Sequence, residues 1–464
     1  MITIGGSIGT GLFMVSGSTI YKAGPGGALL AYILIGILVY IVTASLGEMA
    51  TYMPTSGAFS SYSSKFIDPA IGFAVGWNYW FSWTTTLAAE MTAGAILMRY
   101  WFPNSHSLLW SLLFIFCIFL INLLSVKYYG ETEYWLAIIK IITVIIFICL
   151  GLSMSFGIIG NTPSGFQNFF IEDAPFSGGA LSILGVFIIA GYSFQGTETI
   201  GIMSGESRNP RRDIPKAIRK VFWRIFIFYV LTIGVIGLSI PYTNPNLVNE
   251  DIQNFAMSPF TLVFEQSGFT MAASIMNIVI LTSIFSAGNS GMYASTRLLW
   301  KMSTEGTAPE ILSKINKKGV PIFALLLTTI TTMSVFLLSL IGEGKGFFWL
   351  LSASGLCGFI AWITILVSHY RFRKAFLQQG NVLSELSYYS KWYPNGVLIA
   401  IGTCVCIILG QNYTEFFSNR IDWYSIFATY IGIPIFVLLW AVYKIIKKTK
   451  VVRIKNINLK EGKI

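Results

Sequence analysis

Two short polar stretches interrupt what would otherwise be continuous apolar helix. Residues 5–11 read GGSIGTG, and residues 194–198 read FQGTE. A glycine costs about 1 kcal/mol relative to alanine inside a helix, so these stretches indicate helix breaks. In a bilayer, a break is tolerated only where the freed backbone is covered by protein or lines a cavity. Two breaks far apart in the sequence indicate the substrate site of a secondary transporter.

The first break offers backbone groups of both polarities. Gly9, Thr10 and Gly11 place several N–H groups at the start of the second half-helix, where partial positive charge favours a carboxylate. Carbonyl groups around Ile8, at the end of the preceding half, suit an ammonium group. The first break is therefore expected to bind a small zwitterion. The alternative is a close helix crossing through the small pair Gly5 and Gly9.

The second break adds polar side chains, because Gln195, Thr197 and Glu198 surround Gly196. An ionisable residue at membrane depth costs about 2.5–3.5 kcal/mol to insert, so Glu198 is a functional candidate. We expect its carboxylate to meet the substrate or a transported proton. Alternatively it caps the half-helix that begins there, since a carboxylate is favourable at a helix N-terminus. The two roles can overlap.

Two further ionisable residues lie inside apolar stretches. Glu90 has Thr86 and Gly94 on its helix face, which predicts that it points inward, either toward a substrate or to a structural hydrogen bond. Lys140 is the only basic residue deep within such a stretch. It would either gain and lose a proton during transport, or act as a permanent cation on unwound carbonyl groups of the first break.

Some polar and aromatic candidates also have a packing interpretation. Tyr192 and Phe194, beside the second break, would close over a bound side chain or belong to the core. Ser286, Asn289 and Ser290 lie in a patch of small residues that would face the site or pack against another helix.

The composition requires a membrane. The chain is 54% hydrophobic and 11% charged, whereas soluble domains carry roughly 25% charged residues. Windows of about 20 apolar residues predict an all-α integral membrane protein. Its twelve expected spans lie near residues 1–21, 27–50, 71–98, 107–126, 131–155, 178–204, 218–241, 269–296, 320–341, 347–368, 394–412 and 422–444.

The positive charge is unevenly distributed between the loops. With the N-terminus inside, 26 of the 31 lysines and arginines fall in segments assigned to the cytoplasm, and four fall on the opposite side. This positive-inside bias places both termini in the cytoplasm. The net charge of +11 is therefore explained by the membrane topology and does not indicate nucleic-acid binding. The basic residues from Lys444 to Lys450 are expected to face anionic lipid.

Several other classes of protein are excluded. The five cysteines all fall in apolar spans, and the two histidines lie at opposite membrane faces, so neither a disulfide framework nor a metal site is expected. An enzyme would need a nucleophile with its base, and no such motif is present. The first span begins at Met1 without a basic leader, which argues against a signal peptide and favours a truncated or misassigned start.

The positions of the breaks predict the organisation of a single transmembrane domain over residues 1–464. Breaks in the first and sixth spans indicate a five-plus-five inverted repeat. The expected parts are a first repeat over 1–155, a second over 178–368, two last helices over 394–444 and a cytoplasmic tail over 445–464.

At these residues the chain resembles the amino acid transporter family of the amino acid–polyamine–organocation (APC) superfamily. The motifs are residues 4–13 (IGGSIGTGLF), 23–27 (AGPGG), 47–48 (GE) and 52–54 (YMP). The basic-amino-acid branch is indicated by residues 192–201 (YSFQGTETIG) and 205–210 (GESRNP). Residues 283–297, 368–373 (SHYRFR) and 409–413 (LGQNY) resemble bacterial lysine-specific permeases. The likeness runs over essentially the whole chain.

The resemblance implies a LeuT-like transporter of a bacterial inner membrane that imports lysine with protons. It implies no cofactor, with the proton gradient as energy source, and an amino acid, protons and membrane lipid as partners. The oligomeric state stays open. By the same resemblance, Gly9, Thr10 and Gly11 would hold the α-carboxylate of the substrate.

The residue patterns and the likeness together give the candidate site. The candidate substrate residues are Ile8, Gly9, Thr10, Gly11, Glu90, Tyr192, Phe194, Gln195, Gly196, Thr197, Glu198 and Asn289, and the candidate proton-coupling residues are Lys140 and Glu198. Ile8, Tyr192 and Gln195 would surround the amino group and side chain. Lys140 would stand where sodium-coupled relatives place a sodium ion, which favours proton coupling. Glu90 replaces an expected aspartate, a departure that would shift side-chain selectivity.

Two alternatives stay open at this point. A neutral or broad-specificity amino acid permease would have the same fold and the same breaks. A transporter-like amino acid sensor could use the same site without turnover, and uptake of labelled lysine separates the two.

Overall fold

The structure is a computed structural model that describes residues 8–55, 57–124, 126–159, 165–205, 207, 209–247, 258–267, 271–340, 346–411, 413 and 423–459. Gly5, Gly6 and Ser7 of the first break lie outside the described residues, as do residues 248–257 and 268–270 and Asn412 of the 409–413 motif. Within the described residues the regular elements are helices, and none is a strand.

The first half of the chain forms short and long helices in alternation. In order they are α2 (Thr10–Phe13), α3 (Ser16–Tyr52), α4 (Ala58–Phe66), α5 (Pro69–Met98), α6 (Ser107–Leu124), α7 (Val126–Ser155), the 3-10 turn η1 (Gln167–Phe169), α8 (Gly179–Ser193), α9 (Thr199–Ser204), α10 (Pro210–Ile225), the π-helical η2 (Phe226–Leu231) and α11 (Thr232–Ser239).

The second half continues in the same manner. Its elements are η3 (Pro245–Leu247), α12 (Pro259–Gln266), α13 (Ala272–Thr304), η4 (Glu310–Ser313), α14 (Ile322–Ser339), α15 (Gly346–Gln378), η6 (Leu383–Glu385), α16 (Asn395–Gly410), α18 (Trp423–Tyr430), α19 (Gly432–Lys447) and η7 (Ile454–Asn456).

Six described helices are long and apolar enough to cross a membrane, or seven when the pair α18 and α19, bent by 46°, counts as one span. Three shorter apolar helices accompany them, in α8, α14 and α16. Several expected spans are therefore kinked or interrupted. α3 contains the end of the first expected span and all of the second, which meet at a kink where Gly24 has φ 74° and Pro25 follows.

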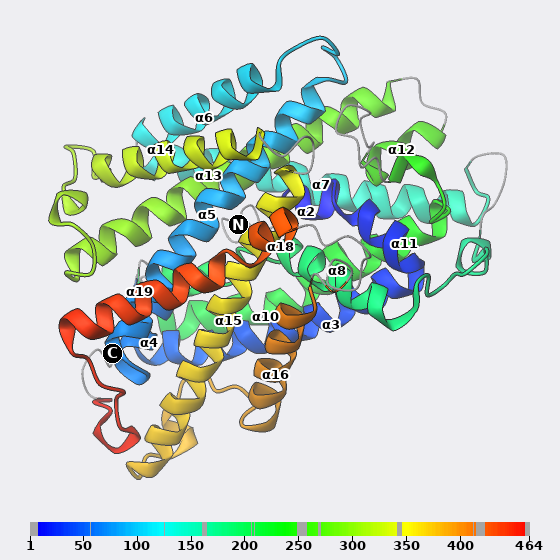
Figure 1. Cartoon of the computed structure of the whole chain (residues 1–464). Coiled ribbons are helices and arrows are strands. Elements are labelled where there is room, and N and C mark those ends of the chain that lie inside the picture. The colour runs from blue at the N-terminus through cyan, green and yellow to red at the C-terminus, as the bar shows by residue number, and fades with distance from the viewer. Residues whose placement is uncertain are drawn as a thin grey trace.

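Helix α5 is the centre of the packing. α13, α15, α4, α19, α6 and α14 all pack against it, and Figure 1 shows α5 running diagonally with α6, α13 and α14 on one side and α15 on the other. The sequence of α5 fits this position, because it contains many small residues, and small residues let the neighbouring helices approach α5 closely. Glu90 is thereby carried into the interior, as the sequence predicted.

Helix α8 ends at Ser193 and α9 begins at Thr199, so the second break lies where the sequence predicted it. The chain crosses residues 194–198 with Gly196 at φ 90°, a conformation that favours glycine. α8 packs against α3 and α15. The break is therefore enclosed by protein, as an interruption inside a bilayer requires.

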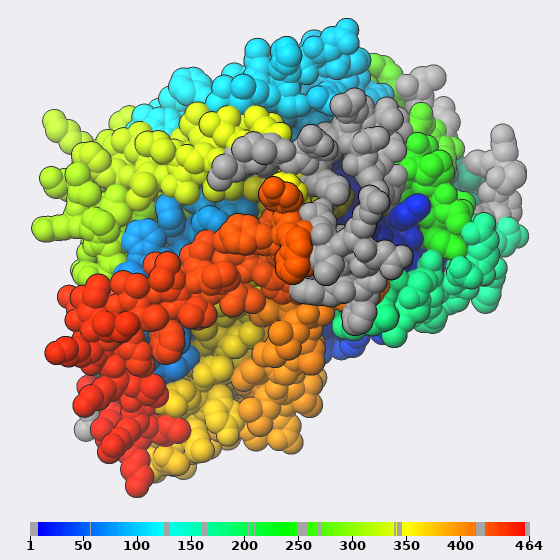
Figure 2. All heavy atoms as spheres, viewed as in Figure 1, coloured from blue at the N-terminus to red at the C-terminus, as the bar shows by residue number. Residues whose placement is uncertain are grey.

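The C-terminal strap, residues 449–459, folds back onto the helices. Figure 2 shows α18 and α19 crossing this face of the molecule before the chain reaches the strap. The Val452 N–H donates to the Ile67 carbonyl at 2.8 Å, and the Gln379 side chain donates to the Ile457 carbonyl at 2.8 Å. Arg371 donates to the carbonyls of both Phe66 and Val452. The strap thus joins the end of α4 to α15.

Only part of the basic segment Lys444–Lys450, which was expected to face lipid, is exposed. Lys444 lies 2.5 Å from a carboxylate oxygen of Asp68, while Lys447, Lys448 and Lys450 are exposed. Lys444 is therefore part of the protein's internal contacts. A lipid contact stays a prediction for the other three.

Candidate functional site

The first break is closed by a carboxylate from another helix. The Thr10 N–H donates to Glu90 Oε1 at 3.3 Å, and Thr10 Oγ1 donates to the same oxygen at 3.0 Å. The Tyr192 hydroxyl donates to it at 3.4 Å. Glu90 Oε2 is buried without a hydrogen-bond partner among the described residues. A carboxylate of the protein therefore accepts a hydrogen bond from an N–H group that was predicted to bind the substrate carboxylate.

The carbonyl side of the same break is held by Lys140. Its Nζ donates to the Ile8 carbonyl at 2.7 Å, and the Lys140 side chain is fully buried in α7. The carboxylates whose charges act on Lys140 are Glu133 and Glu90. One of the two open interpretations of Lys140 placed its ammonium group on an unwound carbonyl of the first break, and the structure puts it there. Whether Lys140 gains and loses a proton stays a prediction.

Close approach explains the glycines of the first break. A Cβ at Gly9 would lie 2.6 Å from Glu90 Oε1 and 2.9 Å from Ala287 Cβ. A Cβ at Gly11 would lie 2.6 Å from the Ser193 backbone. These separations are too short for real contacts, so any side chain would push the surrounding helices apart. The glycines let α5, α8 and α13 meet around one stretch of backbone.

Gln195 connects the second break to α15 and α5. Its Nε2 donates to the Ser354 carbonyl at 2.7 Å, and Ser354 Oγ donates back to Gln195 Oε1 at 2.9 Å. Thr86 Oγ1 lies 2.5 Å from Ser354 Oγ. The Gln195 amide is consequently held in one orientation at the wall of the site.

Glu198 bridges three segments through both of its oxygens. Tyr79 of α5 donates to Oε1 at 2.8 Å, and the Trp362 indole of α15 donates to Oε2 at 3.3 Å. The Gly196 N–H donates to Oε1 at 3.2 Å. Gly196 precedes α9, so this contact is made within the break and not to a free N–H group of α9. The Tyr79 and Trp362 contacts tie the break to α5 and α15.

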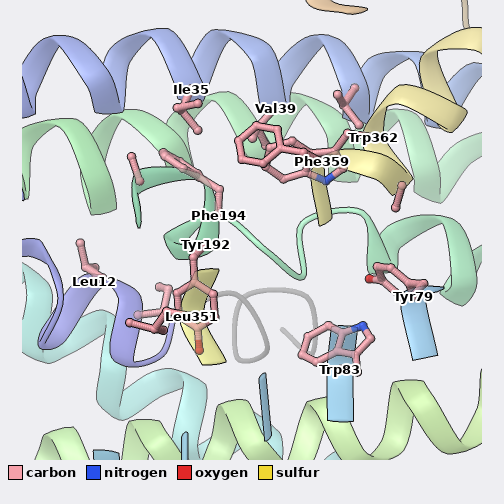
Figure 3. Packing of buried hydrophobic residues seen from close by; sticks show 14 of the residues in the cluster. Leu12, Ile35, Val39, Tyr79, Trp83, Tyr192, Phe194, Leu351, Phe359 and Trp362 are labelled. Atoms are coloured by element: carbon pink, nitrogen blue, oxygen red, sulfur yellow. The ribbon is translucent and has the colours of Figure 1, made fainter. Parts of the chain in front are cut away.

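A small cavity joins the two breaks. It holds about 20 Å³, which is room for a single water molecule. Its walls are Gly9, Gly11, Trp83, Thr86, Glu90, Tyr192, Ser193, Gln195 and Ala287. Figure 3 shows Tyr192 and Phe194 pointing in opposite directions from the end of α8. This conformation is closed around the site and too tight for an amino acid.

The structure brings most of the predicted residues together, but not all of them. Gly9, Gly11, Glu90, Tyr192 and Gln195 line the cavity, with Thr10 and Ile8 bonded directly behind it. The remaining candidates do not line it: Phe194, Gly196, Thr197, Glu198 and Asn289.

Each of these outlying candidates has a local partner. The Phe194 ring stacks 4.1 Å from that of Tyr229, which favours its packing interpretation. Thr197 Oγ1 donates to the Phe194 carbonyl at 3.0 Å. Asn289 Oδ1 accepts from the Asn122 side chain at 2.9 Å, so its patch joins α13 to α6.

Sequence reasoning missed four cavity residues and one buried acid. The cavity residues are Trp83, Thr86, Ser193 and Ala287, of which Thr86 was seen only as a neighbour of Glu90. The acid is Glu133, fully buried in α7. It lies seven residues before Lys140, or two helical turns on the same face, and that spacing was the available signal.

Comparisons with known proteins match nearly the whole chain to one family and to named relatives. The family described as "Amino acid permease" matches residues 1–456. The lysine-specific permease LysP of Escherichia coli (strain K12) is 51% identical over 454 residues, covering 98% of this chain and 93% of that protein. LysP of Lactococcus lactis subsp. cremoris (strain MG1363) is 48% identical, with 100% and 91% covered. The histidine permease HisP of the same organism is 45% identical, with 100% and 96% covered.

Proposed function

Because this chain belongs to the amino acid permease family, we propose that it is a secondary active transporter that imports L-lysine by proton symport across a bacterial inner membrane. The observation that carries this proposal is the Glu90 carboxylate bonded to the Thr10 N–H inside a closed cavity between two helix breaks. Family membership makes the chain a multi-pass membrane transporter of amino acids, not an enzyme. The substrate, the proton and the direction are the proposed part.

The proposed topology follows from the charge pattern and the breaks. Twelve spans with both termini in the cytoplasm leave the basic loops inside, as the positive-inside bias requires. The first five and the next five spans would form an inverted repeat, with residues 394–444 outside it. The C-terminal strap would then lie on the cytoplasmic face.

Lysine is supported by the relatives and by the charges at the site. Two relatives at about half identity are named for lysine. A side-chain ammonium taken from water needs an opposing charge, because an unpaired buried charge costs several kcal/mol. Glu198, in the second break, is the carboxylate that would stay charged to meet this ammonium group, because Glu90 would be neutralised as the substrate enters.

The proposed binding step is an exchange of carboxylates at Thr10. The substrate α-carboxylate would take the N–H groups of the first break from Glu90, with Gly9 and Gly11 leaving room for it. Two carboxylates cannot share that position, because like charges in a low-dielectric site repel strongly. Glu90 would therefore take up a proton as the substrate enters. Lysine and proton would bind together for this reason.

Lys140 would couple the exchange to the backbone. Its ammonium group, 2.7 Å from the Ile8 carbonyl, holds the first break in its present shape. When Glu90 loses its charge, one of the two carboxylates acting on Lys140 is neutralised. The ammonium group would then change partners, and the break would relax toward the opposite face of the membrane.

Uptake of labelled lysine into proteoliposomes, with a competition series of unlabelled amino acids, tests this function. Lysine should compete most strongly, and an inward proton gradient should accelerate uptake. Histidine is the informative competitor, because a histidine permease is also 45% identical to this chain. If histidine or a neutral amino acid competes more strongly than lysine, lysine is not the preferred substrate and that amino acid replaces it in the proposal.

A further inference from the structure

Glu133 and Lys140 form a buried pair on one face of α7, behind the cavity. Both side chains are fully buried, and they are two helical turns apart. Glu133 does not line the cavity, whereas Glu90 does. Lys140 thus has one carboxylate on the substrate side and one on the far side.

A neutral group on α13 holds one oxygen of Glu133. Ser286 donates to Glu133 Oε1 at 2.5 Å, while Glu133 Oε2 and Asn289 Nδ2 are buried without a hydrogen-bond partner among the described residues. Asn289 Oδ1 accepts from Asn122 of α6 at 2.9 Å. One oxygen of the carboxylate is therefore anchored to the polar patch on α13, which the sequence had left open as a packing face.

Among the described residues, the surrounding elements bring no other charge to this pair. The helices that pack against α7 are α6, α11, α12 and α13. α6 and α11 contain no charged residue, and the one on α12, Glu265, is exposed. On α13, Arg297 is beyond the patch and lies against the rings of Tyr293 and Trp300. From α5 the charged group is Glu90, with the Tyr192 hydroxyl beside it.

One buried cation is therefore acted on by the charges of two buried carboxylates. An uncompensated buried charge costs several kcal/mol. The net charge of these three groups is therefore zero when Lys140 is charged and one of the two carboxylates is protonated. We propose that Glu133 is the permanent counter-ion of Lys140, which leaves Glu90 as the carboxylate that binds and releases the coupled proton. This inference rests on the proposed proton symport. The proton enters as Glu90 becomes a carboxylic acid and leaves as it returns to a carboxylate.

Glu133→Gln is the direct test, with Glu131→Gln as the matched control because Glu131 is exposed two residues earlier on α7. Initial lysine uptake is measured against external pH in proteoliposomes. Without Glu133, Glu90 becomes the sole counter-ion of Lys140 and keeps its charge to lower pH. The midpoint of the pH profile should move by at least about one unit toward acid, a tenfold change in proton concentration. Glu131→Gln should retain the wild-type midpoint.

Two further variants keep the test decisive if Glu133→Gln does not fold. Glu133→Asp should restore most of the wild-type midpoint, because it keeps the charge. Ser286→Ala removes the hydrogen bond that favours the charged form, and should shift the midpoint toward acid by less than Glu133→Gln does. In a Glu90→Gln background, Glu133→Gln should cause no further shift.

The outcomes separate this inference from the proposed function. If lysine uptake by the wild-type protein does not depend on pH, the proposal of proton symport itself is rejected. If wild-type uptake depends on pH but folded Glu133→Gln keeps the wild-type midpoint, only the role of Glu133 is rejected. If Glu133→Gln does not fold, an unshifted midpoint in Ser286→Ala leads to the same conclusion.

Discussion

Two buried glutamates in this protein have opposite surroundings. Glu48 of α3 accepts from Arg373 Nε at 2.6 Å and from the Ser390 N–H at 2.7 Å, and His369 Nε2 lies 3.0 Å from it. Arg373 Nη2 bonds its second oxygen, so both oxygens are occupied. Glu90 is equally buried, but one of its oxygens has no hydrogen-bond partner in the described part of the structure.

The difference separates a permanent contact from an exchangeable one. The partners of Glu48 are a guanidinium group, an imidazole and a backbone N–H, drawn from α15 and from the segment before α16. Breaking them leaves charges buried with nothing to replace them. The partners of Glu90 are a backbone N–H and two hydroxyl groups that a substrate carboxylate could also use. We therefore assign Glu48 to the fold and Glu90 to transport.

The largest effect is expected at the Glu48 contact. Arg373→Met should cost about 3–5 kcal/mol, because it leaves the Glu48 carboxylate buried without its main cation. Size-exclusion chromatography of detergent-solubilised protein should show loss of the monodisperse species. Lys374→Met is the control and should behave as wild type. A monodisperse, active Arg373→Met protein would contradict the assignment of Glu48 to the fold.

Lys140→Ala tests the exchangeable side of the comparison. The variant should remain folded in the membrane but lose the pH dependence of lysine uptake, because the cation between the two carboxylates is gone. Thermal stability and uptake at several pH values measure the two properties separately. Uptake that is still accelerated by an inward proton gradient would reduce Lys140 to a packing residue.

Glu198 belongs between the two extremes, because both of its oxygens are bonded yet it lies in a break. Glu198→Gln weakens the charge-assisted hydrogen bonds from Tyr79 and Trp362. Lysine uptake should fall by at least roughly tenfold, equivalent to about 1.4 kcal/mol. Glu172→Gln, on an exposed loop, is the control. Normal uptake with unchanged proton dependence would leave Glu198 with the capping role alone.

The smallest effect is expected at Asp68, which begins α5 and holds the strap. Burial alone would raise the pKa of this carboxyl, but hydrogen bonds from Lys444, the Ala70 N–H and Thr449 lower it below its usual value. A lowered folded-state pKa stabilises the protein above the unfolded pKa, and this stability is lost as the pH falls through the folded value. Asparagine caps a helix as well as aspartate does, so Asp68→Asn removes only the charge paired with Lys444 and should cost up to about 1 kcal/mol at neutral pH.

The pH dependence distinguishes this charge effect from simple loss of packing. In thermal unfolding, the gap between wild type and Asp68→Asn should close on acidification through the carboxyl range. A gap that stays constant from neutral to acid pH would show that the charge of Asp68 contributes nothing to the strap.

The sequence predicted the breaks because clustered glycines and ionisable side chains are both unfavourable in a plain membrane-spanning helix. The positions of α8 and α9 and the candidate residues Glu90, Tyr192 and Gln195 followed from local patterns around the breaks. The kink at Gly24 also lies at an expected boundary.

Contacts between distant segments could not be predicted in the same way. That Glu90 bonds Thr10, or that Glu198 bonds Tyr79 and Trp362, depends on which helix faces lie together. The hydropathy of α5 gives little indication of this, because α5 is buried on nearly all sides. The strap was equally hidden, since the predicted lipid anchor, Lys444–Lys450, runs into it and gives no sign that the chain folds back. Glu133 was the one avoidable omission, given its spacing from Lys140.

The central claim is that lysine and protons enter together through the exchange at Glu90. Its most direct test records the internal pH of proteoliposomes with a trapped indicator while lysine is added outside in sodium-free buffer. Wild-type protein should acidify the interior on lysine addition, and Lys140→Ala should not. Lysine uptake by the wild type without internal acidification, or only in the presence of sodium, would contradict the account.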